Sequence, residues 1–181
     1  MKMNTPNKLT ILRVLMIPFF VVCMLLPFGN GANKWVALAI FVLASLTDWI
    51  DGYLARRDNL VTDFGKFMDP LADKLLVGAA MICMVSLGTL PAWIVIVIIS
   101  REFIISGLRL IAADNGVVIA ASWWGKIKTA TQMVMIIVVI ADLSGVFNII
   151  GQILIYVSLV LTVISLVDYL IKNKKVLLMQ S

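Results

Sequence analysis

Six aspartates fall within residues 45–75 of a chain that is otherwise strongly apolar. The whole chain has only ten acidic residues among 181, and 62% of its residues are hydrophobic. Four of the six, Asp48, Asp51, Asp69 and Asp73, recur at helical spacing in two neighbouring stretches. Carboxylates gathered this closely repel one another unless a cation lies among them. The pattern therefore predicts a metal site rather than four unrelated surface charges.

Drawn as helices, the two stretches each place their aspartates on a single face. At 100° per residue, the first face is about 100° wide and the second about 80° wide. Two such helices joined by a short turn can present four carboxylates toward one point. The first face carries Asp48, Asp51, Gly52 and Ala55, and the second carries Gly65, Asp69 and Asp73.

The residue types narrow the metal and the chemistry. The chain has no histidine, and its two cysteines, Cys23 and Cys83, stand in apolar runs where we expect core packing rather than a disulfide. Carboxylate oxygens suit Mg²⁺ or Mn²⁺, and two such ions about 4 Å apart can clamp a phosphoryl group. Gly52 and Gly65 leave room for a ligand, and Arg56 offers a forked donor to phosphate oxygens. Phosphoryl transfer is the predicted chemistry.

The elements that position these residues are predicted to be membrane helices. The mean hydropathy is +1.06 and only 14% of the residues are charged, which is far from the composition of a soluble domain. A run of roughly 20 apolar residues is long enough to span a bilayer. We therefore expect an all-α integral membrane fold with six transmembrane helices in one domain, residues 1–181. The six runs lie near 9–28, 34–55, 67–88, 92–113, 125–145 and 147–170.

The basic residues predict the orientation of these helices. With the N-terminus inside, Lys34 is the only basic residue in the outer turns. The positive-inside rule then places both termini and the aspartate hairpin on the cytoplasmic side of the cell membrane. The net charge of +5 then reflects topology, and no nucleic-acid partner is expected. Residues 3–13 are expected to form a short interfacial segment before the first helix, with Lys8 and Arg13 reaching lipid headgroups. The predicted cytoplasmic basic residues are Lys2, Lys8, Arg56, Arg57, Lys66, Lys126, Lys128, Lys172, Lys174 and Lys175.

The aspartate motif resembles the signature of a known family. Residues 48–73 read Asp48-x-x-Asp51-Gly52-x-x-Ala55-Arg56, eight residues, then Gly65-x-x-x-Asp69-x-x-x-Asp73. This is similar to the signature of the CDP-alcohol phosphotransferases, with every position filled. Three further stretches, TPNKLTILRVLMIPFF, REFIISGLR and SWWGKIKTATQM, resemble one subfamily, the phosphatidylglycerophosphate synthases.

The resemblance implies an activity and a role for each matching position. It implies transfer of the phosphatidyl group from CDP-diacylglycerol to sn-glycerol 3-phosphate, with release of CMP, by a six-helix membrane protein that is usually a homodimer. Asp73 would also be the general base that takes the proton from the acceptor hydroxyl. The implied ligands of two divalent ions, Mg²⁺ or Mn²⁺, are Asp48, Asp51, Asp69 and Asp73. The implied CDP-binding residues are Asp51, Gly52, Ala55, Arg56 and Gly65.

The signature defines the donor but not the acceptor alcohol. A phosphorylated acceptor requires cationic groups beside the cavity. Arg109 and Lys126 fall near predicted cytoplasmic ends, and Arg101 lies deeper beside Glu102, so we expect these three cations to bind the acceptor phosphate. Lys128 is a weaker candidate for binding the acceptor phosphate. Topology alone would also explain basic residues at cytoplasmic ends, and Arg101 with Glu102 could instead be a buried ion pair that locks helix packing.

Some acidic residues, and the function as a whole, have alternative interpretations. Asp58 in a polar turn, Asp63 at a helix start and Asp168 with Lys172 at an i,i+4 spacing are expected to be structural. The same chemistry could use another acceptor, such as inositol phosphate or serine, although the subfamily-like stretches argue against it. A metal-ion transporter would need acids throughout the bilayer depth, whereas the predicted outer half has only Asp142.

Overall fold

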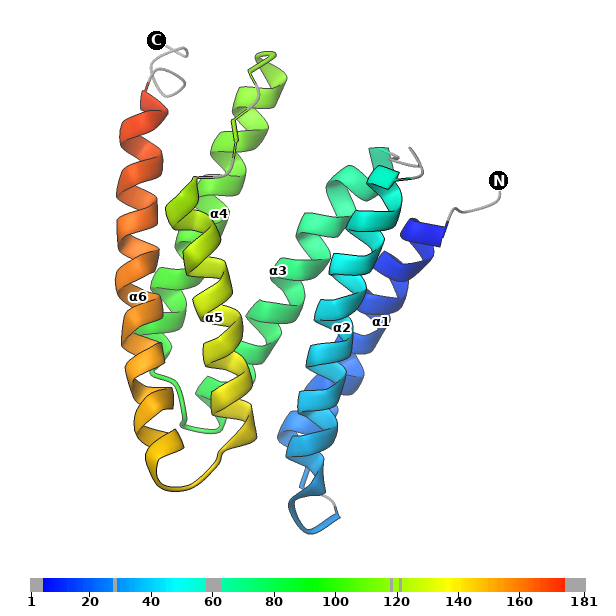
Figure 1. Ribbon diagram of the computed structural model, residues 1–181, viewed down its shortest axis with the longest axis vertical. Helices are drawn as coiled ribbons and strands as arrows, with labels where there is room; N and C mark the ends of the chain where they lie inside the picture. The colour runs from blue at the N-terminus through cyan, green and yellow to red at the C-terminus, as the bar shows by residue number, and fades with distance from the viewer. Residues whose placement is uncertain (1–4, 28, 58–62, 118, 121, 175–181) are drawn as a thin grey trace. The chain divides into compact units, whose positions relative to one another are not determined.

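The computed structural model is all-helical across the residues that it describes, which are 5–27, 29–57, 63–117, 119–120 and 122–174. For residues 5–6, 30, 48–57 and 63–67, it describes the backbone alone. The helices in chain order are α1 (Thr5–Leu25), the short 3₁₀ helix η1 (Gly29–Gly31), α2 (Ala32–Arg57), α3 (Asp63–Ser86), α4 (Ala92–Asp114), α5 (Trp123–Ala141) and α6 (Val146–Lys172) (Figure 1).

The predicted helices are confirmed in their order and approximate bounds. Each apolar run of the sequence forms one α-helix. A helix satisfies the backbone hydrogen bonds of such a run internally, which is required where the surroundings offer no water. The helix that carries the second pair of aspartates begins at Asp63, as expected. Asp58 lies outside the described residues.

The expected interfacial segment at the N-terminus is wrong in two respects. Helix α1 begins at Thr5 and continues without a break to Leu25, so residues 5–13 are its first turns rather than a separate element. Arg13 does not reach toward headgroups, because its side chain is fully buried and its Nε donates to the carbonyl oxygen of Ala44 on α2, 3.2 Å away. A buried guanidinium requires acceptors within the protein, and α2 provides one.

The described chain divides into two compact units, residues 1–89 and 90–181. In the first unit, α1 packs against both α2 and α3. Ala37, Ala44 and Ala72 are fully buried there, and such small residues let neighbouring helices approach closely. The rings of Phe20 and Phe41 fill the contact between α1 and α2, with their centroids 5.9 Å apart.

The second unit contains α4, α5 and α6, and α6 packs against the other two helices. The buried face of α6 is unusually polar, since Ser158, Thr162 and Ser165 are all fully buried. Thr162 satisfies its hydroxyl locally by donating to the carbonyl oxygen of Ser158, one turn earlier. This arrangement is common in membrane helices, where a hydroxyl that lacks water bonds to its own backbone.

The outer surfaces of the helices identify a membrane protein. Among the described residues, three helical segments are long and apolar enough to cross a bilayer: Asn7–Leu25, Trp123–Ala141 and Val146–Lys172. Large apolar side chains such as Phe19 and Phe103 are about two-thirds exposed in the protein alone, which is costly in water but favourable in lipid. The number of spans and the cytoplasmic position of the termini remain predictions.

Candidate active site

The four aspartates of the motif lie on two helices of the first unit. Asp48 and Asp51 belong to the C-terminal half of α2, and Asp69 and Asp73 belong to the N-terminal half of α3. Helices α2 and α3 pack against each other. The side chains of Asp48 and Asp51 are outside the described part, as are those of Ala55 and Arg56 and the surroundings of Gly52 and Gly65. The convergence of all four carboxylates therefore remains a prediction.

The two aspartates on α3 border its buried face. Asp69 and Asp73 are separated by one helical turn and are both partly buried. Ala72 and Leu76, which lie on the adjoining face of the helix, are essentially inaccessible. The carboxylates thus stand at the edge of the packed interior.

Two polar side chains of α1 contact the helices that carry the aspartates, and sequence reasoning missed both contacts. Thr10 Oγ1 donates to Asp69 Oδ1 at 2.5 Å, across 59 residues of sequence. Arg13 bonds to the carbonyl oxygen of Ala44, which precedes Asp48 by one turn of α2. The available signal was only a threonine and an arginine at i,i+3 spacing within an apolar helix, and this spacing does not identify partners.

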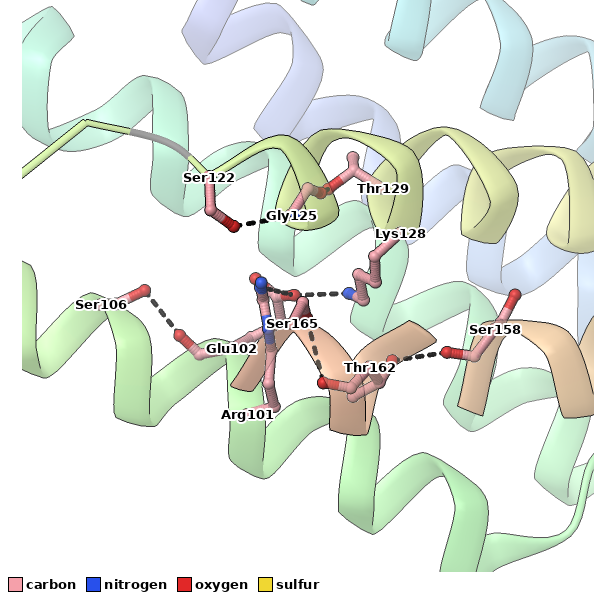
Figure 2. Close-up of polar contacts among 10 residues, drawn as sticks. All are labelled: Arg101, Glu102, Ser106, Ser122, Gly125, Lys128, Thr129, Ser158, Thr162 and Ser165. Atoms are coloured by element: carbon pink, nitrogen blue, oxygen red, sulfur yellow. Dashed lines mark hydrogen bonds and ion pairs between the residues drawn. The ribbon is translucent and has the colours of Figure 1, made fainter. Parts of the chain in front are cut away.

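The second unit contains a buried charge cluster that joins all three of its helices (Figure 2). Glu102 on α4 accepts through Oε1 from both Arg101 Nη1, at 2.9 Å, and Lys128 Nζ on α5. Arg101 Nε also donates to Ser165 Oγ on α6, at 3.1 Å. The ion pair between Arg101 and Glu102 considered from the sequence is therefore present, and Lys128 belongs to the same cluster.

This cluster brings two cations to one carboxylate. Arg101 is 7% exposed and Lys128 is 2% exposed, so both have left solvent almost completely. A Cβ on Gly125 would lie 3.4 Å from Arg101 Nη2, so the first turn of α5 lies against the guanidinium. Paired in this way, the charges offset part of their desolvation cost and leave one formal positive charge among the three groups.

The remaining cations predicted to bind the acceptor have a different environment. Arg109 and Lys126 are exposed, and the Arg109 guanidinium lies over the ring of Tyr169, 5.9 Å from its centroid. Such a position favours a cation because the face of an aromatic ring is electronegative. Arg101, Arg109 and Lys126 all belong to the second unit. Their proximity to the aspartates of the first unit remains a prediction.

Residues 3–164 match the sequence profile of CDP-alcohol phosphatidyltransferase. The chain belongs to the CDP-alcohol phosphatidyltransferase family. It is 52% identical over 143 residues to a Bacillus subtilis protein named CDP-diacylglycerol–glycerol-3-phosphate 3-phosphatidyltransferase, an alignment that covers 74% of each chain. A Haemophilus influenzae protein of the same name is 43% identical over 94% of this chain and 93% of its own length. A Mycobacterium tuberculosis protein named probable phosphatidylglycerophosphate synthase is 43% identical over 92% of this chain and 79% of its own length.

The residues of this CDP-alcohol phosphatidyltransferase fit the divalent metals on which the family generally depends. Among the side chains that the structure describes, no three acidic, cysteine or histidine side chains are grouped to hold a metal, since only two of the four motif aspartates are included. The donor set of four carboxylates without sulfur or imidazole is nevertheless the one that Mg²⁺ and Mn²⁺ prefer. The hydrogen bond to Asp69 holds one of these donors in place.

Glu102→Gln tests whether the charge cluster is a structural requirement of this family member. The substitution removes the charge of the carboxylate that accepts from both buried cations, Arg101 and Lys128, and we expect it to lower the free energy of unfolding by about 3 kcal/mol. Thermal unfolding of the purified protein in detergent measures the loss as a lower midpoint.

Asp168→Asn is the matched control for this prediction. It breaks the ion pair between Asp168 and Lys172, whose side chain is 61% exposed. We expect the free energy of unfolding to fall by about 0.5 kcal/mol or less. Equal midpoints for the two variants would show that the buried cluster contributes no more than the pair at the end of α6.

Proposed function

We propose that this protein transfers the phosphatidyl group from CDP-diacylglycerol to sn-glycerol 3-phosphate, giving phosphatidylglycerophosphate and CMP in phospholipid biosynthesis. The observation that carries the proposal is the complete motif from Asp48 to Asp73 in a chain that shares 43% to 52% identity with relatives named for this reaction. The apolar exterior of the helices agrees with a lipid substrate, since it places the protein where CDP-diacylglycerol resides.

The reaction needs a base and a site for the leaving group. The acceptor hydroxyl oxygen forms a bond to the phosphorus that bears diacylglycerol, the bond from that phosphorus to the CMP oxygen breaks, and the hydroxyl proton passes to Asp73. A carboxylate is the natural base in a chain without histidine. Asp73 is partly buried at the edge of the packed interior, a position from which one oxygen can face a polar substrate.

The motif also provides for the metal and the cytidine diphosphate. Divalent ions, Mg²⁺ or Mn²⁺ and two in number, would neutralise charge on the diphosphate when held by Asp48, Asp51, Asp69 and Asp73. Gly52, Ala55 and Gly65 have little or no side chain and would admit the cytidine beside the helix backbones. Asp51 and Arg56 would complete the CDP site, with the guanidinium directed to the diphosphate.

Three cations of the second unit are proposed to hold the acceptor phosphate. Arg109 and Lys126 are exposed and available to a ligand from solution. Arg101 belongs to a cluster of two cations and one carboxylate, and its guanidinium is proposed to bind the phosphate together with Arg109 and Lys126. This assignment favours glycerol 3-phosphate over serine, which carries no phosphate.

The surrounding assembly follows from the same proposal. We propose six transmembrane helices, with both termini and the active site facing the cytoplasm, from which the soluble glycerol 3-phosphate would enter and into which CMP would be released. The excess of basic residues at the proposed inner ends supports this orientation. We further propose a homodimer in the cell membrane.

CMP release from CDP-diacylglycerol by the purified full-length protein tests the activity and the base together. We expect release to require both glycerol 3-phosphate and Mg²⁺ or Mn²⁺, and Asp73→Asn to lower kcat at least about 100-fold because the proton acceptor is lost. The CMP and the lipid product are measured separately, so that hydrolysis is distinguished from transfer.

Three outcomes of this assay, the third together with a vesicle transport measurement, would overturn parts of the proposal. Release that occurs only with inositol phosphate or serine would retain the chemistry and refute the acceptor. Full activity in Asp73→Asn would refute the base. Protein that transports Mn²⁺ into vesicles but releases no CMP with any acceptor would refute the enzyme.

Arg109→Gln and Lys126→Gln test the acceptor site. We expect each substitution to raise KM for glycerol 3-phosphate about tenfold, with the KM for CDP-diacylglycerol unchanged, because each removes one charged contact to the phosphate. Lys172→Gln, which removes an exposed lysine paired with Asp168, is the control and should leave both constants unchanged. An equal rise of KM in all three variants would indicate a general charge effect instead of a site.

A further inference from the structure

The hydroxyl of Thr10, on α1, bonds directly to a motif aspartate on α3. Thr10 is fully buried, and it donates through Oγ1 to Asp69 Oδ1 at 2.5 Å. Donation to a carboxylate is stronger than a bond between neutral groups, and it is stronger still where water is excluded. The contact therefore restricts the rotation of the Asp69 side chain.

A carboxylate held in this way presents its two oxygens differently. Oδ1 accepts from the threonine hydroxyl, so the orientation of Oδ2 is also determined by the plane of the group. Metal-binding carboxylates are commonly hydrogen-bonded by a neighbouring side chain that orients them. Thr10 has the chemistry of such a neighbour, because its hydroxyl donates to the carboxylate and brings no charge of its own.

The position of α1 makes the contact rigid. Arg13, three residues after Thr10, is fully buried and donates through Nε to the carbonyl oxygen of Ala44 on α2. One face of α1 is thus bonded to α2 one turn before Asp48, and to α3 at Asp69. Phe20 and Phe41 continue the contact between α1 and α2 farther along the helix.

We infer that Thr10 is a positioning residue for metal binding, because its hydroxyl orients the Asp69 carboxylate toward the divalent ion. The inference rests on the proposed function, in which Asp69 is a metal ligand. Loss of a group that orients a metal ligand typically weakens metal binding about 10- to 100-fold. A purely structural threonine would affect stability while leaving the affinity for metal unchanged.

Mn²⁺ binding to the purified full-length protein, without substrate, tests the inference. Free Mn²⁺ is measured by electron paramagnetic resonance during titration of the wild type, Thr10→Val and Thr10→Ser. We expect Thr10→Val to raise the Kd for Mn²⁺ at least about tenfold, since valine keeps the shape and removes the hydroxyl. Thr10→Ser retains the donor, so its Kd should stay within about twofold of the wild type.

Thr162→Val is the matched control. Thr162 is also fully buried in a helix, but its hydroxyl donates to the carbonyl oxygen of Ser158 on the same helix. Its substitution should leave the Kd for Mn²⁺ unchanged. Thr10→Ala provides a second variant without the hydroxyl and should weaken Mn²⁺ binding as Thr10→Val does, so the test holds even where the valine variant fails to fold.

The outcomes separate this inference from the proposed function. Normal Mn²⁺ affinity in folded Thr10→Val or Thr10→Ala would overturn the positioning role, and so would a Thr10→Ser variant as weak as Thr10→Val. In transfer assays, we expect the rate of Thr10→Val to recover as Mn²⁺ is raised, because the hydroxyl is not itself a reacting group. A wild type that binds Mn²⁺ but transfers nothing would refute the proposed function, while the binding comparison would still decide the role of Thr10.

Discussion

Repulsion among the carboxylates carried by α2 and α3 is the constraint on which the rest of the first unit depends. Four carboxylates that converged between two packed helices would be stable together only with a cation among them, so the packing of α2 against α3 and the proposed metal site are considered together. The neighbouring residues serve the same requirement. Buried alanines bring the helices close, and the hydroxyl of Thr10 bonds to one of the carboxylates. The glycines of the motif are proposed to leave space for a ligand.

The second unit meets the opposite problem, which is the burial of two cations, Arg101 and Lys128. Arg101 and Lys128 share Glu102, and Ser165 accepts a further hydrogen bond from the guanidinium. A membrane protein cannot rely on water to satisfy such groups, so each is tied to a neighbouring helix. The same pairing joins α4, α5 and α6, and Arg101 is in addition proposed to bind the acceptor phosphate. Structural and acceptor-binding roles for Arg101 are therefore compatible.

The helices and the family could be predicted from the sequence because both depend on local patterns. Long apolar runs define the helices, and the pair of Asp168 with Lys172 follows from an i,i+4 spacing, which the structure confirms at 2.7 Å. The contacts of α1 could not be predicted in this way. Arg13 looked like an interfacial residue because no local pattern reveals that Ala44 accepts its hydrogen bond, and the partner of Thr10 lies 59 residues away. The acceptor-binding role of Arg109 and Lys126 stays a prediction, because helical spacing does not determine which distant residues a side chain meets.

The central claim is that the motif aspartates together hold the metal at which the phosphatidyl group is transferred. Anomalous diffraction at the manganese edge, from crystals of the catalytically active full-length protein grown with Mn²⁺, tests it most directly. The account predicts two manganese peaks about 4 Å apart, enclosed by Asp48, Asp51, Asp69 and Asp73. Manganese bound elsewhere, or only one or two of these carboxylates in contact with it while CDP-diacylglycerol is bound, would contradict the account.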